Sequence, residues 1–424
     1  MVSAANSCAD NAPGSRGLQK RNELVLDALQ HEVQIKAMSE ADHRRRTRPP
    51  RTSPPLPLPD QVALVLQGGG ALGSFQAGVY EMLAEAAIEV DWVAGISIGA
   101  VNAALIAGNP PEARVAAMTE FWRIVTSGLP SFPIPWVPDR AREFLNEWSA
   151  GIVSTLGVPG FFRPRLIPPS LAVPGTPEAM SFYDSSQLVD TLNGLVDWDL
   201  LNDGPVRLAV GAVEIESGNF AYFDTRKMRI DARHIMASGA LPPGLPAVEI
   251  DGKYYWDGGI VSNTPLSHVL ANQNADLLVF QVDLFSASAG LPRTIMDVMA
   301  RQKEIQYSSR TRQVSDQLLR IRRERELIRT VLAKLPDALR DDADVIRLAD
   351  TAREYALSLV QLVYRANAWE GGSRDFEFSE RTMNDHWQAG RDAVEATIDK
   401  AGLIATNILD GKTAAFDLTP RKGV

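Results

Sequence analysis

A serine between two glycines is the first feature of the sequence that could carry out chemistry. Gly95-Ile96-Ser97-Ile98-Gly99 follows a short apolar run and precedes a longer apolar segment. A strand, a tight turn and a helix in this order form a nucleophile elbow, in which the glycines permit a strained turn and the hydroxyl projects from the sheet edge. The helix start lends positive partial charge to a developing oxyanion. The pattern predicts Ser97 as a nucleophile, with Gly95 and Gly99 forming the elbow.

A glycine-rich segment one strand–helix unit earlier predicts the groups that bind the oxyanion. The segment follows the apolar run 62–66 and opens a helix. Consecutive small residues at a helix start expose backbone N–H groups, which can hold a negative oxygen. In a parallel sheet the segment opens on the same edge as Ser97. The predicted oxyanion-hole residues are Gly68, Gly69, Gly70, Ala71 and Gly73.

An aspartate much later in the chain is the candidate base. Asp257 closes a predicted hairpin over 248–256 and precedes Gly258 and Gly259. A serine nucleophile needs a proton acceptor, and two glycines leave space around the carboxylate to reach Ser97. Asp-Gly-Gly is also an ordinary turn sequence, so it gains its weight from the serine and glycine motifs.

Alternating strands and helices must position these residues. Apolar runs predict strands over 62–66 and 92–96, followed by helices over 74–87 and 98–107. Further predicted elements are strands over 206–215, 221–223 and 277–282 and a helix over 232–238. This order predicts an α/β fold with a mainly parallel central sheet and helices on its faces.

The chain divides into three predicted parts. Residues 1–59 form a disordered or partly helical extension with a candidate helix over 18–41 and a basic run over 44–48. Residues 60–290 form the catalytic domain. Residues 291–424 form a mainly helical domain, with helices over 294–335 and 341–368.

A segment rich in proline and aromatic residues, 129–184, interrupts the catalytic domain. Regular core elements carry little proline, so we interpret this segment as an insertion. It forms either a lid that contacts acyl chains through Trp136, Phe161 and Phe162, or a segment whose aromatic side chains pack onto the core.

Composition limits the partners and the compartment. The chain has 424 residues and a net charge of −9, which argues against a nucleic-acid partner. One cysteine, Cys8, excludes an internal disulfide framework and is typical of a reducing compartment. The first 17 residues lack a signal sequence and no apolar stretch is long enough to span a bilayer, so we predict a cytoplasmic protein with peripheral membrane contact. The sequence leaves the oligomeric state open.

Together these motifs resemble the patatin-like phospholipase family over residues 62–284. The resemblance also includes Phe182-Tyr183-Asp184 and the run from Met236 to Pro242. The segment 375–379, with His386 and Trp387, is similar to an extra C-terminal domain on one bacterial branch of the family.

The resemblance implies a patatin-like three-layer fold and a serine lipid acyl hydrolase with a catalytic dyad. Asp257 would accept the Ser97 proton and later activate water. The substrates would be phospholipids, lysophospholipids or neutral acyl lipids, with no metal and no organic cofactor. Two departures stand out, because the family usually carries Asp where this chain has Gln67, and Arg or Lys where it has Leu72. The missing cation makes neutral esters, lysolipids or thioesters more plausible substrates.

The sequence leaves other functions open. Gly68-x-Gly70-x-x-Gly73 with Asp91 also fits a dinucleotide-binding fingerprint, although Asp91 starts its strand whereas the ribose-binding acid should end it. His268 could complete a Ser–Asp–His triad. The same dyad could serve an acyltransferase or thioesterase, and the fold could serve as a non-catalytic membrane- or protein-interaction module.

Overall fold

The computed structural model describes residues 53–126, 139–352, 355–367 and 370–419. Residues 52–424 form one compact unit. The predicted helix over 18–41 and the basic run over 44–48 lie outside the described residues. Trp136 of the insertion lies outside them too.

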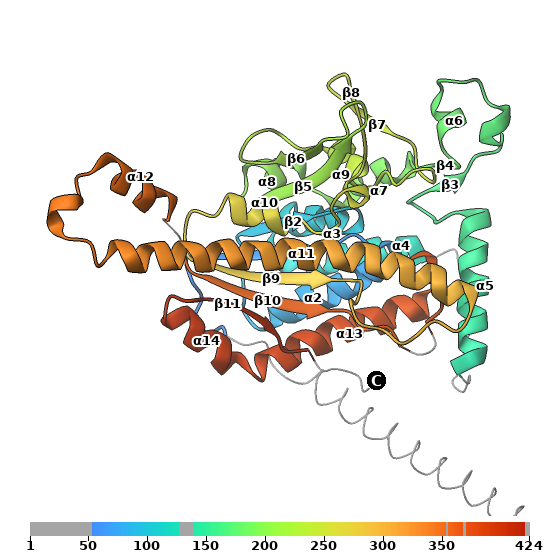
Figure 1. Ribbon diagram of the computed structural model, residues 1–424. Coiled ribbons are helices and arrows are strands. Elements are labelled where there is room, and N and C mark those ends of the chain that lie inside the picture. The colour runs from blue at the N-terminus through green and yellow to red at the C-terminus, as the bar shows by residue number, and fades with distance from the viewer. Residues whose placement is uncertain (1–52, 127–138, 353–354, 368–369, 420–424) are drawn as a thin grey trace, which may run out of the picture. The chain divides into compact units, whose positions relative to one another are not determined.

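A nine-stranded sheet runs through the described part of the chain (Figure 1). Its order is β11-β10-β9-β1-β2-β5-β8-β7, with β6 paired to β5. The pairs from β11 to β5 are parallel, whereas β6, β7 and β8 run antiparallel to their neighbours. The strands are β1 (Gln61–Leu66), β2 (Trp92–Gly95), β5 (Arg207–Glu214), β6 (Phe220–Asp224), β7 (Val248–Ile250), β8 (Lys253–Asp257), β9 (Leu277–Asp283), β10 (Leu357–Val363) and β11 (Thr413–Asp417). The predicted α/β fold with a mainly parallel sheet is confirmed.

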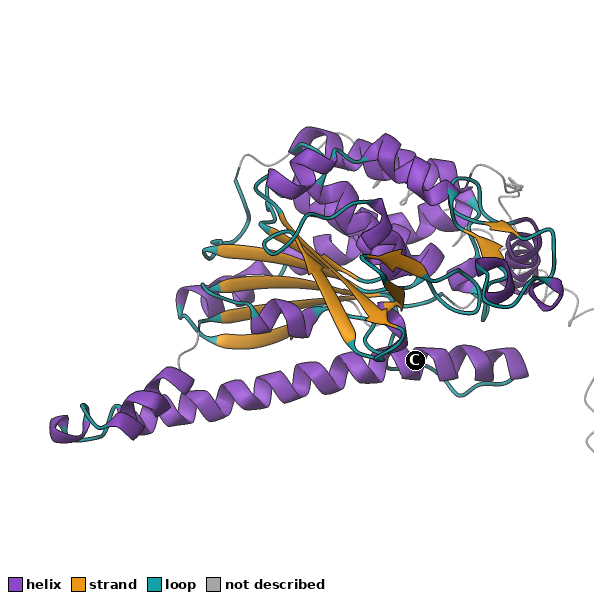
Figure 2. Ribbon diagram, turned by 90° about the horizontal axis from the view of Figure 1, so that it is seen from above, coloured by secondary structure: helices purple, strands orange, loops and turns teal. Residues whose placement is uncertain are grey.

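Helices cover both faces of this sheet (Figure 2). On one face Leu64, Leu66 and Phe280 pack in the larger core, and on the other Ala63 and Val65 join the smaller one. Strands covered on both faces consist of continuous apolar residues, which explains the runs in β1 and β9. The helices are α2 (Ser74–Glu85), α3 (Ile98–Ala107), α4 (Pro111–Thr126), α5 (Asp139–Leu156), α6 (Pro177–Met180), α7 (Gln187–Leu195), α8 (Trp198–Asp203), α9 (Ala232–Gly239), α10 (Leu266–Ala271), α11 (Ile295–Leu332), α12 (Ala343–Thr351), α13 (Glu380–Ile398) and α14 (Ala401–Leu409).

The C-terminal region contributes strands as well as helices. The helix expected over 341–368 was wrong, because α12 ends at Thr351 and β10 follows it along β9. A buried apolar run of this length fits either element, and here the open edge of β9 selects the strand. The long helix expected over 294–335 is present as α11.

Close helix packing joins the C-terminal region to the rest of the unit. A Cβ at Gly78 of α2 would lie 1.8 Å from the carbonyl oxygen of Trp387 on α13. A Cβ at Gly390 would likewise lie 2.0 Å from the carbonyl oxygen of Phe75. Only glycine at both positions lets the two backbones approach this closely.

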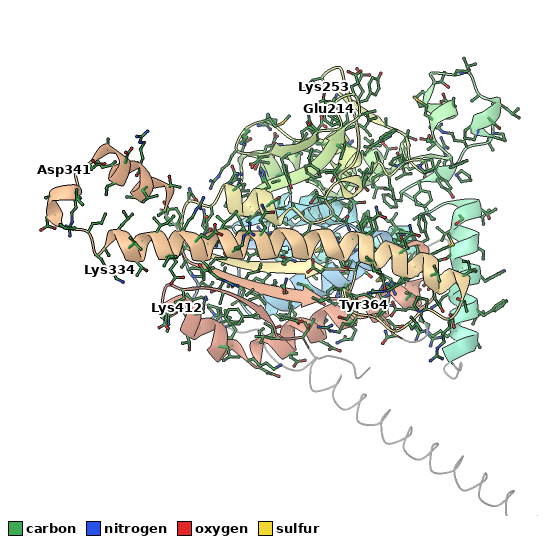
Figure 3. All side chains as sticks on the ribbon, viewed as in Figure 1. Glu214, Lys253, Lys334, Asp341, Tyr364 and Lys412 are labelled. Atoms are coloured by element: carbon green, nitrogen blue, oxygen red, sulfur yellow. The ribbon has the colours of Figure 1, made fainter. Side chains whose placement is uncertain are left out.

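The antiparallel end of the sheet carries Asp257. The β7–β8 hairpin lies beside β5, and an exposed ion pair of 3.0 Å joins Lys253 to Glu214 across β8 and β5 (Figure 3). Such exposed pairs contribute little free energy, so the backbone ladder carries the positioning. In that ladder Ala212 of β5 pairs with Asp257.

Candidate active site

Gln67 fixes the base of the glycine segment where β1 ends. Its side chain is fully buried and accepts the N–H groups of Leu284, at 2.6 Å, and Phe285, at 3.1 Å. Its amide nitrogen donates to Thr264 Oγ1 at 3.1 Å. The glutamine thus ties the end of β1 to the segment after β9 without a buried charge.

The predicted oxyanion residues divide into two groups. Gly68, Gly69 and Gly70 line the main cavity, whereas Ala71 and Gly73 do not. The N–H of Gly68 donates to the carbonyl of Asn263 at 3.2 Å, so it is already engaged. No acceptor in the described part of the chain takes the N–H of Gly69 or Gly70.

Glycine is required within this segment for steric reasons. Gly70 has φ of +56°, and a Cβ there would lie 2.2 Å from the carbonyl oxygen of Asp375 in the 3₁₀ helix η5 (Arg374–Phe376). A Cβ at Gly73 would lie 2.5 Å from Ile98, at the start of α3. The segment is therefore held between α3 and the C-terminal region.

Ser97 occupies the turn between β2 and α3 with φ of +54° and ψ of −124°. Such a backbone costs about 1–3 kcal/mol for a residue other than glycine. The flanking glycines are necessary, because a Cβ at Gly95 would lie 2.2 Å from the carbonyl of Gly99, and one at Gly99 would lie 2.4 Å from that of Leu66. The predicted elbow geometry around Ser97 is present.

Ser238 stabilises the strained turn from outside. Its hydroxyl accepts the N–H of Ser97 at 3.0 Å and donates to the carbonyl of Gly211 at 2.7 Å. The Ser97 hydroxyl itself does not cap α3. Because Ser238 satisfies the backbone of the turn, the Ser97 side chain is free to face the cavity that it lines.

Asp257 closes β8 and lies 2% exposed at the floor of the same cavity. Its Oδ1 accepts the N–H of Gly259 at 2.7 Å. Burial raises the pKa of Asp257 to about 7, while the Gly259 N–H and the nearby Ser97 side chain offset part of that rise. The structure thus brings the two residues of the predicted dyad to one cavity, and their pairing stays a prediction.

The cavity around this pair has a volume of about 600 Å³ and a mainly apolar lining. Residues far apart in the chain form its walls. The apolar lining side chains include Phe161, Phe162, Phe182, Leu241, Pro242, Leu245, Phe285, Tyr307, Phe376 and Phe378. A cavity of this size and character suits an acyl chain.

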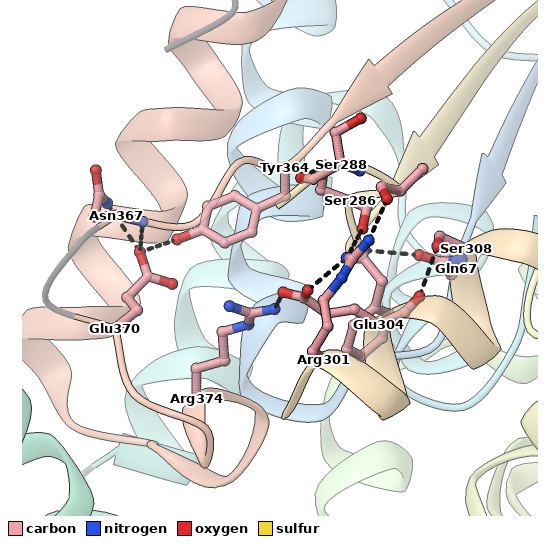
Figure 4. Close-up of polar contacts among 12 residues, drawn as sticks. Gln67, Ser286, Ser288, Arg301, Glu304, Ser308, Tyr364, Asn367, Glu370 and Arg374 are labelled. Atoms are coloured by element: carbon pink, nitrogen blue, oxygen red, sulfur yellow. Dashed lines mark hydrogen bonds and ion pairs between the residues drawn. The ribbon is translucent and has the colours of Figure 1, made fainter. Parts of the chain in front are cut away.

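The C-terminal region forms one wall of the cavity, which the sequence did not indicate. Lys303 of α11 and Asp375 line it and form an ion pair, and Lys303 lies 5.3 Å from the ring of Phe376. A polar network behind this wall joins α11 to η5, where Glu304 pairs with both Arg301 and Arg374 (Figure 4).

The two other catalytic candidates are engaged away from Ser97. His268 Nε2 donates a hydrogen bond to Oδ2 of the Asp224 carboxylate at 2.9 Å, and the ring stacks on Tyr222. Asp91 accepts the N–H of Val62 at 2.8 Å, at the start of β2 and so at the opposite end from the glycine segment. Neither the triad with His268 nor the dinucleotide fingerprint is supported by these positions.

The insertion divides its aromatic residues between core and surface. Phe161 and Phe162 are buried and pack with Phe121 and Tyr183, as the packing interpretation expects. Their inner edges still line the cavity. Exposed apolar side chains of the insertion come instead from α5 and from the loop between the short strands β3 (Arg163–Pro164) and β4 (Tyr183–Asp184).

Neither a metal cluster nor a membrane-spanning helix is found in the part of the chain that the structure describes. No group of three or more His, Cys, Asp or Glu side chains there is arranged to hold a metal ion. No helix there is long and apolar enough to cross a bilayer.

Comparison with known proteins gives matches over most of the described unit. The family model of patatin-like phospholipases matches residues 64–270, and a second model, described as patatin phospholipase, matches residues 305–407. An uncharacterized NTE family protein of Mycobacterium tuberculosis is 26% identical over 233 residues, covering 55% of this chain and 51% of that protein. A lysophospholipase of Saccharomyces cerevisiae is 26% identical over 243 residues, covering 54% of this chain and 11% of that protein.

The chain spans about half the length of the mycobacterial relative that it matches. Among solved structures, human GIVD cytosolic phospholipase A2 matches with a TM-score of 0.41 and 11% identity, over 84% of this chain and 61% of that chain. Both matched segments contain residues that line the cavity. The first contains Ser97 and Asp257, and the second contains Asp375 and Phe376. The chain belongs to the patatin-like phospholipase family.

Proposed function

We propose that the chain is a serine lipid acyl hydrolase that cleaves carboxylic esters of acyl lipids through a Ser97–Asp257 dyad. The observation that carries this proposal is the position of Ser97 near the buried carboxyl of Asp257, with both residues lining one mainly apolar cavity. Family membership and the lysophospholipase relative support the same class of reaction.

The reaction proceeds through a covalent acyl-enzyme. The Asp257 carboxylate takes the Ser97 proton as Oγ attacks the ester carbonyl, and the tetrahedral oxyanion forms beside the glycine segment. The intermediate collapses, the bond to the alcohol breaks, and the proton passes from Asp257 to the departing oxygen. A water molecule then gives its proton to Asp257 and attacks the acyl-enzyme. As the bond between the acyl carbon and Ser97 Oγ breaks, Asp257 returns this proton to Oγ, which releases the fatty acid and restores both residues.

The oxyanion donors are backbone N–H groups that line the cavity. We assign this role to Gly69 and Gly70, and to Ile98, the residue that follows the nucleophile and begins α3. One such donor contributes roughly 3 kcal/mol to the lowering of the barrier. Gly68 supports the segment through its two hydrogen bonds with Asn263 instead.

A carboxyl can serve as base without a histidine when its pKa approaches neutrality. Burial raises the pKa of Asp257 to about 7, which brings its proton affinity close to that of an imidazole. The ionised form remains available at neutral pH. The dyad therefore requires that the residue at position 257 be both a carboxylic acid and buried.

The substrate class follows from the cavity and from the glycine segment. Leu72, where the family usually has a cation, is fully buried and offers no charge to an anionic headgroup. Lys303, which also lines the cavity, is neutralised by Asp375. We therefore propose lysophospholipids and neutral acyl esters as the preferred substrates.

The parts of the chain take separate roles in this proposal. Residues 60–290 carry Ser97, Asp257 and the glycine segment, whereas residues 291–424 supply the outer wall of the cavity through Lys303 and Phe376. The role of residues 1–59 and the cytoplasmic location stay predictions.

A lipid panel with identified products tests the proposal. Wild-type protein should release fatty acid and become labelled by a fluorophosphonate at Ser97, whereas Ser97→Ala should do neither. His268→Ala is the matched control for the rival triad and should keep turnover in its folded fraction. Turnover that survives Ser97→Ala, or that disappears in folded His268→Ala, contradicts the dyad.

The same panel separates related activities. An alcohol acceptor added to the assay would yield a transesterified product if the chain is an acyltransferase, and an acyl thioester would be the faster substrate if it is a thioesterase. A folded protein that neither reacts with the fluorophosphonate nor turns over any ester would support a non-catalytic module.

A further inference from the structure

The loop between β3 and β4 has an apolar and uncharged tip. Residues 166–177, Leu-Ile-Pro-Pro-Ser-Leu-Ala-Val-Pro-Gly-Thr-Pro, contain no charged side chain. Their bulky aliphatic side chains are unusually exposed, at 100% for Leu166, 57% for Ile167, 77% for Leu171 and 70% for Val173. Contiguous exposed apolar surface of this kind marks an interaction site.

The backbone of this tip has few N–H groups that need water. The prolines have none, and they are Pro168, Pro169, Pro174 and Pro177. The N–H groups of Leu171, Ala172 and Thr176 donate to carbonyl groups within the tip itself. Because an unsatisfied N–H is costly in an apolar medium, this tip can leave bulk water more cheaply than an ordinary loop.

Charged residues are confined to the base of the loop and are paired there. Arg163 binds Asp184 at 2.9 Å, and Arg165 binds Glu178 at 3.6 Å and Ser181 at 3.1 Å. These contacts hold the base closed while the tip projects. The division into a paired, polar base and an apolar tip differs from the arm formed by α11 and α12, where exposed Leu327 and Val331 lie among charged residues.

The loop is continuous with the cavity that holds Ser97. Phe182, half-exposed at the end of the loop, lines that cavity together with Tyr183 of β4. The Tyr183 hydroxyl donates to the carbonyl of Ser154 at 2.8 Å and so joins the loop base to α5.

We propose that residues 166–182 form a surface that inserts into a lipid bilayer beside the cavity. The proposal rests on the proposed function, because this surface would give an acyl hydrolase access to lipids of a bilayer. Aliphatic residues of the tip enter the acyl boundary, and Phe182 lies at headgroup level. An acyl chain then passes along Phe182 to Ser97 without crossing open water.

Binding to vesicles tests this surface independently of catalysis. The full chain is sedimented with phosphatidylcholine vesicles at high salt, where attraction to charged headgroups is screened. Leu171→Asp is compared with Leu409→Asp, a matched control on α14, because the two leucines are 77% and 76% exposed. Figure 1 places α14 and α6 at opposite ends of the unit. Thermal melting confirms that each variant is folded.

We expect Leu171→Asp to lower the vesicle partition coefficient about tenfold or more, and Leu166→Asp with Leu171→Asp about 100-fold or more. Leu409→Asp and Ser97→Ala should bind like the wild type. Equal binding by the Leu171 and Leu409 variants, or no binding by the wild type, overturns the proposal. A change in oligomeric state confined to the loop variants would also overturn it, since a second copy would then cover the loop.

A fluorescent label gives a second, positional measurement. Cys8 is the one cysteine of the chain, so Cys8→Ser with Leu171→Cys carries a single polarity-sensitive label. Its emission should shift to the blue on addition of vesicles, whereas the label at Leu409→Cys should not shift. Shifts of equal size at both positions would exclude local insertion. A wild-type protein that binds vesicles but hydrolyses no ester would contradict the proposed function, while its binding would still support the membrane surface.

Discussion

Replacing Asp257 with asparagine should abolish turnover and at the same time stabilise the fold at alkaline pH. The carboxyl is buried, and burial raises its pKa from an ordinary value of 3.8 to about 7. In the folded state the neutral form is therefore favoured. The unfolded chain ionises near pH 4 and the folded protein only near pH 7, so stability falls as pH rises between these values.

The structure gives the size of this effect. The difference between 3.8 and about 7 corresponds to about 4 kcal/mol at pH values above 7, and to almost nothing below pH 4. Asparagine keeps an acceptor for the N–H of Gly259 and carries no charge. The gain in the free energy of unfolding for Asp257→Asn should therefore be close to zero at pH 4. It should reach a few kcal/mol at pH 8, with about 4 kcal/mol as the upper bound.

Denaturant unfolding of both proteins across this pH range measures the prediction. Asp283→Asn is the control, because Asp283 is also buried with its pKa raised to about 7 but does not line the cavity. Asp283→Asn should show the same pH-dependent gain in the free energy of unfolding while ester turnover continues. A stability difference for Asp257→Asn that is equal at pH 5 and pH 8 would mean that the carboxyl is not held neutral by burial, and the reasoning would fail.

Three further changes probe the supports of the site. Ser238→Ala leaves the N–H of Ser97 and the carbonyl of Gly211 unpaired, so we expect a loss of about 1–3 kcal/mol in unfolding free energy and a lower acylation rate in burst kinetics. Gly70→Ala forces a Cβ to within 2.2 Å of the Asp375 carbonyl at positive φ, and should reduce kcat about 100-fold on soluble esters, the effect of misplacing one oxyanion donor. Asp224→Ala strands the buried guanidinium of Arg207 and should cost about 3–5 kcal/mol in denaturant unfolding, with esterase activity per folded molecule retained.

The sequence is most informative where local rules and the site coincide. The strand, turn and helix around Ser97 follow from an apolar run, a glycine pair and a small-sided helix, all within 92–107. Each step is local, so no knowledge of distant contacts is needed. The proposed pairing of Ser97 with Asp257 is different, because it depends on β8 joining β5 in antiparallel register, and the family resemblance implied it.

The C-terminal strands show the limit of local reasoning. Leu357–Val363 is an apolar run of a length that either a strand or a helix can adopt, and its neighbour β9 decides the outcome. Thr413–Asp417 is short and partly exposed, as edge strands often are, and carries little apolar signal. The contribution of Lys303 and Phe376 to the cavity wall depends on how these strands place η5 and α11, so it could not be predicted either.

The two departures of the glycine segment from the family pattern have a common physical consequence. The family usually carries an acid and a cation there, and this chain replaces both with the buried, uncharged residues Gln67 and Leu72. Neither position therefore places a charge in the protein interior that would have to be paired. Neutral hydrogen bonds from Leu284 and Phe285 to Gln67 and the full burial of Leu72 then hold the segment at any pH. The glycine segment should keep its geometry while Asp257 titrates, so kcat/KM should rise with pH up to a single apparent pKa of about 7. A second titration below that value would show that another ionisable group controls the segment.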